Sequence, residues 1–232
     1  MTPAGAPRRF APMLAGTAAG SLGPADLEEI GISIIALDIL ELWMGVGFDR
    51  IRAAGGLGAF VGWDGPIVGV ARYSDEAPSA TGWRGRGLPQ LLKQLDDKLR
   101  LRSSVDGAVV DVVIDDLRTE AASLGSGVVD ATGDRAVTVW SGAGEPPADG
   151  TIVVTEAANL EAAVGRYHSS SGWTELATAA DGPLVPGCDC RTCRVSGAAY
   201  IANLANVREI TAQHLLGWHN THRLRLLVEG PS

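Results

Sequence analysis

The sequence predicts an α/β fold built around a mainly parallel sheet. Short apolar runs rich in β-branched residues alternate along the chain with segments of helical character. Hydrophobic residues make up 46% and charged residues 20% of the 232 residues, which is ordinary for a protein with an apolar core. This length suffices for one large domain or two small ones.

The first third of the chain shows the alternation most clearly. A helix is expected from Pro24, because acidic residues follow in its first turn, and Gly31 is expected to end it. The β-branched run Ile32–Leu37 predicts a buried strand. The other elements expected here are a strand at 11–15, a helix at 48–54, and a turn at 64–66 between the segments 60–63 and 67–71.

The remaining elements follow from similar patterns. Leucines on one helical face predict an amphipathic helix over Leu88–Leu101, and near-helical apolar spacing predicts one long helix over Ala198–Trp218. The segments 73–87 and 165–187 are polar, and we expect them to be irregular. The expected strands are 108–114, 128–130, 136–140 and 151–155, with a linker at 141–150 and a short helix at 159–164.

Charge and hydropathy exclude two classes of protein. The net charge of −8 means that the molecule as a whole does not attract polyanions, so any nucleic-acid site must be a local basic patch. No segment reaches the roughly 18 consecutive apolar residues of a transmembrane helix, and prolines and glycines interrupt the apolar stretch after the first residues. We therefore expect a soluble, cytoplasmic protein without a membrane partner.

The three cysteines of the chain lie together as Cys188, Cys190 and Cys193. An odd, clustered set cannot form a disulfide framework and indicates a metal site in a reducing compartment. With His219 as fourth ligand, the set would form the closed Cys₃His tetrahedron typical of structural Zn²⁺. A closed site leaves no position for substrate, so this zinc would not be catalytic. The alternative fourth ligands are His168, His214 and His222.

Such a site requires the long predicted helix to fold back, so that His219 after its C-terminal end meets the cysteine loop. The metal would then clip the helix to the loop, and its binding energy would be folding energy. We accordingly divide the chain into a barrel-like domain, 1–182, and a Cys₃His zinc-binding subdomain with a long helix, 183–232.

The cysteines open a longer ordered motif: after Cys-x-Cys-x₂-Cys come Ala199-Tyr200-Ile201-x₂-Leu204, Glu209-Ile210, Leu215-Leu216 and His219-Asn220. This series resembles the C-terminal zinc region of the tRNA-guanine transglycosylase (queuine/archaeosine tRNA-ribosyltransferase) family. Two earlier stretches also resemble the family. They are 12–31, similar to its first strand and helix, and 55–67, similar to its Gly-Gly-Leu-His-x-Phe-x-Gly-Trp-x-Gly-Pro-Ile segment.

The resemblance implies a modified (β/α)₈ barrel with an inserted zinc subdomain. It also implies the exchange of guanine in tRNA for a 7-deazaguanine base, with one aspartate as nucleophile and a second that handles the proton. A complete barrel usually needs about 200–250 residues, and fewer precede Cys188. We therefore expect a reduced or degenerate (β/α)₈ TIM-type barrel with a C-terminal zinc-binding subdomain.

The sequence departs from the family where the catalytic aspartates belong. Val70 stands where the proton-handling aspartate is expected, and Thr151–Ala157 lacks an aspartate at the place of the nucleophile. Three carboxylates remain as catalytic candidates: Asp115 and Asp116, which follow the strand 108–114, and Glu156.

These departures favour a non-catalytic, zinc-binding accessory subunit. It would pair with a catalytic transglycosylase subunit or with a second copy of itself, and tRNA is a further expected partner. The alternative is an active but diverged transglycosylase or glycosidase, a pentosyltransferase acting on a 7-deazapurine nucleoside or nucleic acid.

Overall fold

The computed structural model describes most of the C-terminal half of the chain and separate parts of the N-terminal half. The described residues are 7–14, 22–38, 46, 50, 53–55, 57–70, 100–102, 109–112, 128–129, 136–147, 150–176 and 181–230.

The largest sheet has six strands in the order β1-β8-β7-β6-β5-β4. Its parallel part pairs β8 with β1 on one side and β7 on the other, and Phe10 lies opposite Val153. The remaining strand pairs, β7–β6, β6–β5 and β5–β4, are antiparallel. The prediction of a mainly parallel sheet is therefore wrong for the part of this sheet from β7 to β4. The strands are β1 (Arg9–Pro12), β4 (Arg100–Arg102), β5 (Val109–Val112), β6 (Val128–Val129), β7 (Ala136–Val139) and β8 (Thr151–Thr155).

Strands β2 (Ile35–Asp38) and β3 (Ile67–Val70) form a second, parallel sheet. An isolated parallel bridge joins Met13, just after β1, to Ala36 of β2. The first strand therefore contacts both the next strand along the chain and β8.

Helix α1 (Pro24–Ile30) has the predicted bounds. The Asp26 carboxylate accepts a hydrogen bond from the Gly23 N–H at 3.0 Å, which satisfies one of the free donors at the helix start. Leu27 and Ile30 are buried, so this short helix is held by its apolar face. Gly31 ends it with φ 86°, a left-handed conformation that suits glycine.

Several other predictions are corrected by the structure. The segment 60–63, which was expected only to precede the 64–66 turn, begins within a helix, α4 (Leu57–Val61). Most of the expected helix 48–54 lies outside the described residues, as does 88–99 of the helix expected over 88–101. The last two residues of that helix, 100 and 101, belong to β4.

The segment 165–187, expected to be irregular, contains an antiparallel hairpin of β9 (Arg166–Ser169) and β10 (Gly172–Glu175). The hairpin follows α6 (Ala157–Ala163), which occupies much of the predicted helix 159–164. Trp173 anchors the hairpin, since its indole N–H donates to the Gly142 carbonyl at 2.8 Å. Serines and other polar residues around this turn interrupt the alternation of apolar and polar residues, so the sequence shows no clear strand pattern here.

Three helices complete the chain: α7 (Arg191–Val195), α8 (Ala198–Asn206) and α9 (Ile210–Glu229). The single helix predicted over 198–218 is wrong, because the chain turns between α8 and α9. Arg208 takes a left-handed φ of 58° and its N–H donates to the Ala205 carbonyl, while the Glu209 N–H donates to the Leu204 carbonyl. These two bonds form a Schellman motif, in which glycine usually holds the left-handed position.

Replacing Arg208 by glycine is expected to stabilise the protein by about 1 kcal/mol, because it removes the cost of a left-handed non-glycine residue. For a chain of this size the melting temperature should rise by about 2–4 °C. The matched control is Val207→Gly, one residue earlier, where φ is −90° and glycine only adds unfolded-state entropy. Thermal unfolding of both variants checks this, and a lower melting temperature for R208G would contradict it.

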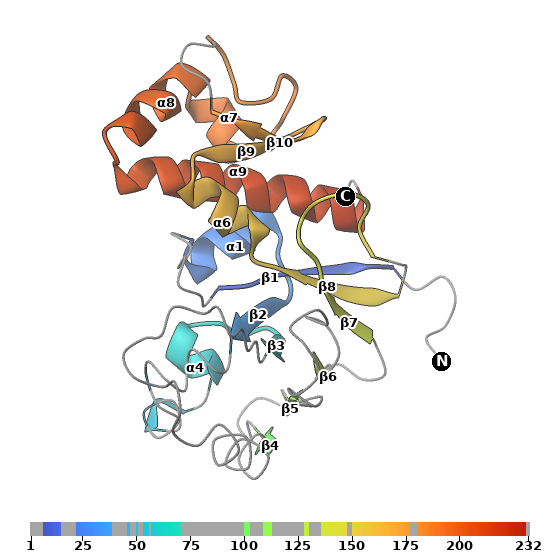
Figure 1. The fold of residues 1–232 in the computed structure, drawn as a ribbon. Helices are drawn as coiled ribbons and strands as arrows, with labels where there is room; N and C mark the ends of the chain where they lie inside the picture. The colour runs from blue at the N-terminus through green and yellow to red at the C-terminus, as the bar shows by residue number, and fades with distance from the viewer. Residues whose placement is uncertain are drawn as a thin grey trace, which may run out of the picture.

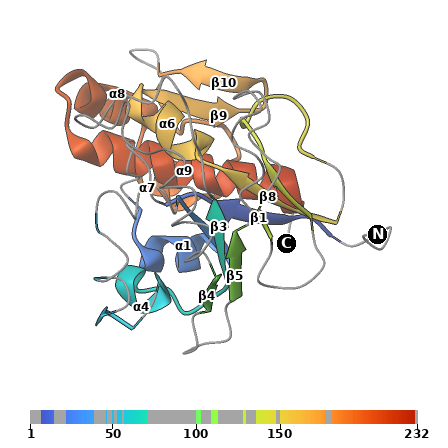
Figure 2. The ribbon, with the colours of Figure 1, turned by 60° about the horizontal axis from the view of Figure 1, so that its bottom comes forward.

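Helix α9 runs across the middle of the molecule, with α8 and the β9–β10 hairpin on one side and β1 and α1 on the other (Figures 1 and 2). Apolar residues of α9, among them Trp218 and Val228, share one buried cluster with Phe10 of β1. The Phe10 N–H also donates to the Glu229 carboxylate at 2.8 Å. Residues of both expected domains thus contribute to a common core. Within the described part of the chain, no helix is long and apolar enough to cross a membrane.

Candidate metal centre

The cysteine loop is shaped by the start of α7. Cys190 is the N-cap residue of this helix, and its sulfur accepts a hydrogen bond from the Cys193 N–H at 3.3 Å. This cap brings the side chains of Cys190 and Cys193 to one end of the helix. The hydroxyl of Thr192 donates to the Leu215 carbonyl of α9 at 2.9 Å and so holds the loop against α9.

His219 completes the cluster from the middle of α9, ten residues before the end of the helix and not after it as expected. Its Nδ1 atom lies 3.8, 3.4 and 3.3 Å from the sulfurs of Cys188, Cys190 and Cys193. A regular ZnS₃N tetrahedron with bond lengths of about 2.3 and 2.0–2.1 Å has S···N edges of about 3.5 Å. The four side chains are therefore positioned to bind a metal ion.

The other nitrogen of the His219 ring fixes how the ring is presented. Its Nε2–H donates to the His168 backbone carbonyl at 3.0 Å, inside the protein. A neutral imidazole that carries its proton on Nε2 has a lone pair on Nδ1, the atom that faces the sulfurs. This second contact orients the ring as metal-binding histidines require.

The cluster is buried and electrostatically crowded. Burial lowers the pKa of His219, but hydrogen bonds and electrostatic attraction to the sulfurs of Cys188 and Cys193 together outweigh burial and raise this pKa to about 9. Hydrogen bonds from Cys190 and Cys193 lower the pKa of the Cys188 thiol. Hydrogen bonds with Cys188 and Cys193, together with burial, raise the pKa of the Cys190 thiol. Neighbouring thiolates repel one another, so a divalent cation between them would replace their protons.

The other three histidines have separate partners. His168 contributes its backbone carbonyl, and burial, followed by Arg223 and His219, lowers its side-chain pKa to about 4. His214 lies 3.8 Å from the Asp26 carboxylate. His222 lies 3.0 Å from the Asp189 carboxylate. Of the four histidines, His219 is the one that reaches all three sulfurs.

Asn220, next to His219, joins three backbone segments and is fully buried. Its side-chain oxygen accepts from the His168 N–H at 2.9 Å. Its amide nitrogen donates to the carbonyls of Ala158 at 3.1 Å and Arg166 at 3.0 Å. Asn220 thus positions the β9 residue whose carbonyl holds the His219 ring.

Of the three catalytic candidates, the structure describes only Glu156. Glu156 follows β8 and is the half-buried N-cap residue of α6. Val70 is the last residue of β3. Asp115 and Asp116 lie outside the described residues.

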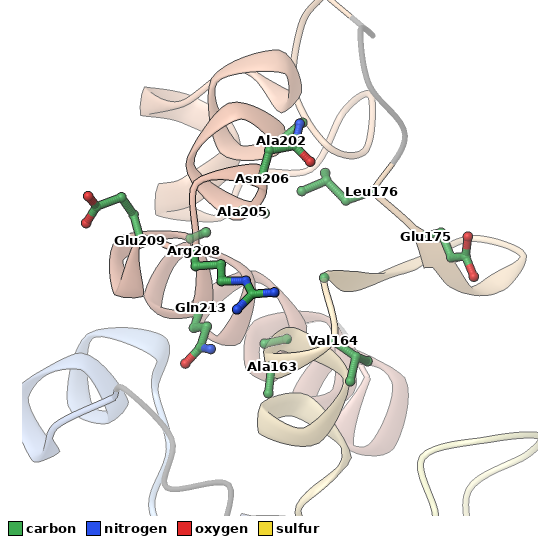
Figure 3. Close-up of a pocket in the computed structure, with 13 residues that line it drawn as sticks. Ala163, Val164, Glu175, Leu176, Ala202, Ala205, Asn206, Arg208, Glu209 and Gln213 are labelled. Carbon is green, nitrogen blue, oxygen red and sulfur yellow. The ribbon is translucent and has the colours of Figure 1, made fainter.

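A cavity of about 510 Å³ opens between α6, β10, α8 and α9 (Figure 3). Its alanines come from three of these elements, and their small side chains leave the hollow between the helices. Arg208 reaches toward the hollow from the turn before α9, whereas Glu209 points away from it. The cavity lining therefore combines small apolar side chains with polar and charged ones.

Sequence reasoning did not single out Asn220 for its hydrogen bonds, nor the pair of Asp189 and His222. One available signal was spacing, because residues three apart on a helix share a face, as His219 and His222 do on α9. The His168 carbonyl had no such signal, since it depends on the hairpin.

Comparison with known proteins finds a match in the C-terminal part of the chain. The family model described as queuine tRNA-ribosyltransferase matches residues 152–230. This range contains β8, α6, the hairpin, the four candidate ligands and α9.

Curated proteins that are also named queuine tRNA-ribosyltransferase are similar to part of this chain. The queuine tRNA-ribosyltransferase of Nitrosomonas eutropha is 33% identical over 98 residues, which are 42% of this chain and 25% of the relative. That of Azotobacter vinelandii is 33% identical over 114 residues, 49% of this chain and 28% of the relative. That of Psychrobacter cryohalolentis is 34% identical over 95 residues, 41% of this chain and 22% of the relative.

The matched part spans about a quarter of the length of these relatives. The resemblance carried by the cysteine motif is confirmed, whereas the resemblance of residues 12–31 and 55–67 stays a prediction. Residues 152–230 of this chain are thus similar to the C-terminal part of the queuine tRNA-ribosyltransferase family.

Proposed function

We propose that this protein is a non-catalytic, zinc-binding accessory subunit that acts with a catalytic transglycosylase in the 7-deazaguanine modification of tRNA. Zn²⁺ is the metal that suits the cluster, because three thiolates and one imidazole form a closed tetrahedral shell around it. In this role the ion joins the α7 loop to α9 and performs no chemistry on the substrate.

Strand order supports a barrel origin for the fold. In a closed (β/α)₈ barrel the first strand lies between the second and the last, all parallel. Here β1 pairs in parallel with β8 and is joined to β2 by the Met13–Ala36 bridge, and β2 pairs in parallel with β3. We interpret the arrangement β3-β2-β1-β8-β7 as the retained part of a reduced barrel, to which the antiparallel strands β6, β5 and β4 are attached.

The observation that carries the non-catalytic role is how these parallel strands end. Catalytic side chains of such barrels come from the C-terminal ends of the strands. Strand β8 ends at Thr155, which is 1% exposed and whose hydroxyl accepts a hydrogen bond from the Ala157 N–H at 3.1 Å. Strand β3 ends at Val70, which can neither move a proton nor hydrogen-bond a base.

Exposed apolar side chains on the three C-terminal helices support a protein partner. Val195 of α7, Tyr200 of α8 and Ile210 of α9 are 70%, 55% and 70% exposed. Large apolar side chains exposed on neighbouring elements are typical of surfaces that contact another protein. The partner is a catalytic transglycosylase subunit or a second copy of this chain, and tRNA contacts would come largely from the catalytic subunit, since this chain carries a net charge of −8.

Two measurements test the proposal. The purified chain alone is expected not to incorporate labelled guanine into tRNA, and guanine incorporation by this chain would refute the non-catalytic role. Affinity purification of the tagged chain from its native cell is expected to recover a full-length transglycosylase, whereas recovery of this chain as a lone monomer would contradict the accessory role.

Charged substitutions locate the contact. Tyr200→Glu and Ile210→Glu should abolish the association at unchanged stability. The matched control is Leu227→Glu, which changes a 40% exposed leucine near the other end of α9 and should leave the association intact. Equal loss with all three variants would place the contact elsewhere.

The second candidate function is the diverged pentosyltransferase. Glu156 favours it, because this carboxylate follows β8 at the edge where barrel active sites form. Its side chain is one methylene longer than the aspartate of the family, and a shift of about 1 Å can cost around a hundredfold in rate. Base exchange that is lost in Glu156→Gln would establish this alternative.

A further inference from the structure

We propose that Cys188, Asp189 and His222 form a second zinc-type cation site that shares the Cys188 sulfur with the Cys₃His cluster. This proposal rests on the proposed function in one respect, since it requires Zn²⁺ in the first site. It assigns a ligand to the pair of His222 and Asp189 beside the cluster, which the structural site does not use.

The three donor atoms already lie together. The Cys188 sulfur, an Asp189 carboxylate oxygen and a His222 ring nitrogen are all within 4.8 Å of one another. The His222 Nε2 atom lies 3.0 Å from Asp189 Oδ1. In a tetrahedral zinc site with N and O ligands at about 2.0–2.2 Å this edge is about 3.4 Å, so a small outward movement of Asp189 admits the ion.

His222 is presented rigidly. It lies on α9 nearly one turn after His219, and its side chain is 11% exposed. The ring of Trp218 stacks on it with centroids 5.8 Å apart and an interplanar angle of 21°. Asp189, by contrast, has a side chain that is 83% exposed, so it can adjust to an incoming ion.

Charge favours a second cation at this place. Three thiolates around one Zn²⁺ leave a net charge of −1, and the adjacent Asp189 carboxylate adds another negative charge. A thiolate bound to one zinc ion keeps lone pairs, so the Cys188 sulfur can bridge two ions. Sulfur, imidazole and carboxylate donors suit Zn²⁺ better than Mg²⁺ or Ca²⁺, which prefer oxygen.

The two sites would differ in strength and access. The Cys₃His site has four protein ligands and a buried Cys190 and His219, so it should hold its ion tightly. The second site has three protein ligands, and water at the exposed Asp189 side completes its shell. It should therefore fill at a higher free zinc concentration and exchange its ion more readily.

Zinc titration of the full chain, followed by native mass spectrometry, tests the proposal. The wild type is expected to bind one zinc at low free zinc and a second at higher free zinc. His222→Gln and Asp189→Asn should each stop at one zinc. The matched control, His214→Gln, removes another histidine of α9, one that lies beside Asp26, and should still bind two. Because Asp189 is exposed, D189N should fold even where H222Q does not.

A cadmium-loaded sample provides an independent readout. With ¹¹³Cd the wild type should give two resonances coupled through the shared Cys188 sulfur, and D189N should give one. A wild type that saturates at one zinc overturns the second site and leaves the proposed structural zinc intact. Two zinc ions retained in both H222Q and D189N also overturn it, and a chain that binds no zinc refutes the structural zinc as well.

Discussion

Replacing Cys190 by serine is expected to release the structural metal and to lower the free energy of unfolding by at least about 4 kcal/mol. Structural zinc contributes about 10–16 kcal/mol in small zinc-finger peptides, and its binding energy is folding energy. Cys190 is 1% exposed, shares the core cluster with Phe10 and Trp218, and caps α7. Its loss therefore removes a ligand, a helix cap and core packing together.

The measurement combines zinc content by elemental analysis with thermal unfolding. Zinc should fall from one or more per chain to none in C190S, and the melting temperature should fall by about 10 °C or more. The matched control is Arg191→Ala, the next residue, whose guanidinium forms an exposed ion pair with Glu29 at 2.9 Å. Such pairs contribute about 0–1 kcal/mol, so this variant should keep its zinc and nearly all its stability. C190S protein with full zinc content would contradict the assigned ligand.

Replacing Asn220 by alanine is expected to cost about 3–5 kcal/mol of stability. The substitution leaves the N–H of His168 and the carbonyls of Ala158 and Arg166 without their partner inside the protein. Each buried polar group that loses its hydrogen bond costs about 1–3 kcal/mol. Since Asn220 also positions the His168 carbonyl that orients His219, zinc affinity should fall by about tenfold or more.

Denaturant unfolding and chelator competition measure the two effects separately. Asn203→Ala, an exposed asparagine of α8, is the control and should change neither quantity. Asn220→Asp keeps an oxygen acceptor for the His168 N–H but loses both donated bonds. Because the accepted bond positions His168, N220D should bind zinc more tightly than N220A. Equal stability of N220A and the wild type would show that the three contacts contribute nothing.

The fold could be predicted where local signals agree with packing. Helix α1 has its acidic first turn and its terminal glycine, and β8 has a continuous apolar run, so both have the predicted bounds. The end of α8 could not be predicted, because its left-handed position carries Arg208 instead of glycine. The β9–β10 hairpin was missed since its register depends on contacts distant in sequence, such as the bond of Trp173 to Gly142.

The candidate site divides in the same way. The tight cysteine spacing and the following histidine predicted which four side chains the structure brings together. The predicted position of His219 after the end of its helix was wrong, because α9 continues beyond Trp218 as far as Glu229. The contacts behind the ligands, such as the His168 carbonyl with His219, arise only when the hairpin packs against α9.

The bond between Phe10 and Glu229 has a consequence for synthesis on the ribosome. These residues are 219 positions apart, and ribosomes add about 5–20 residues per second, so Phe10 is made roughly 10–40 s before its partner. Until then β1 lacks the apolar surface of α9 that buries it. The nascent chain must therefore be kept from aggregating, and we expect its yield in cells to depend on chaperones that bind unfinished chains.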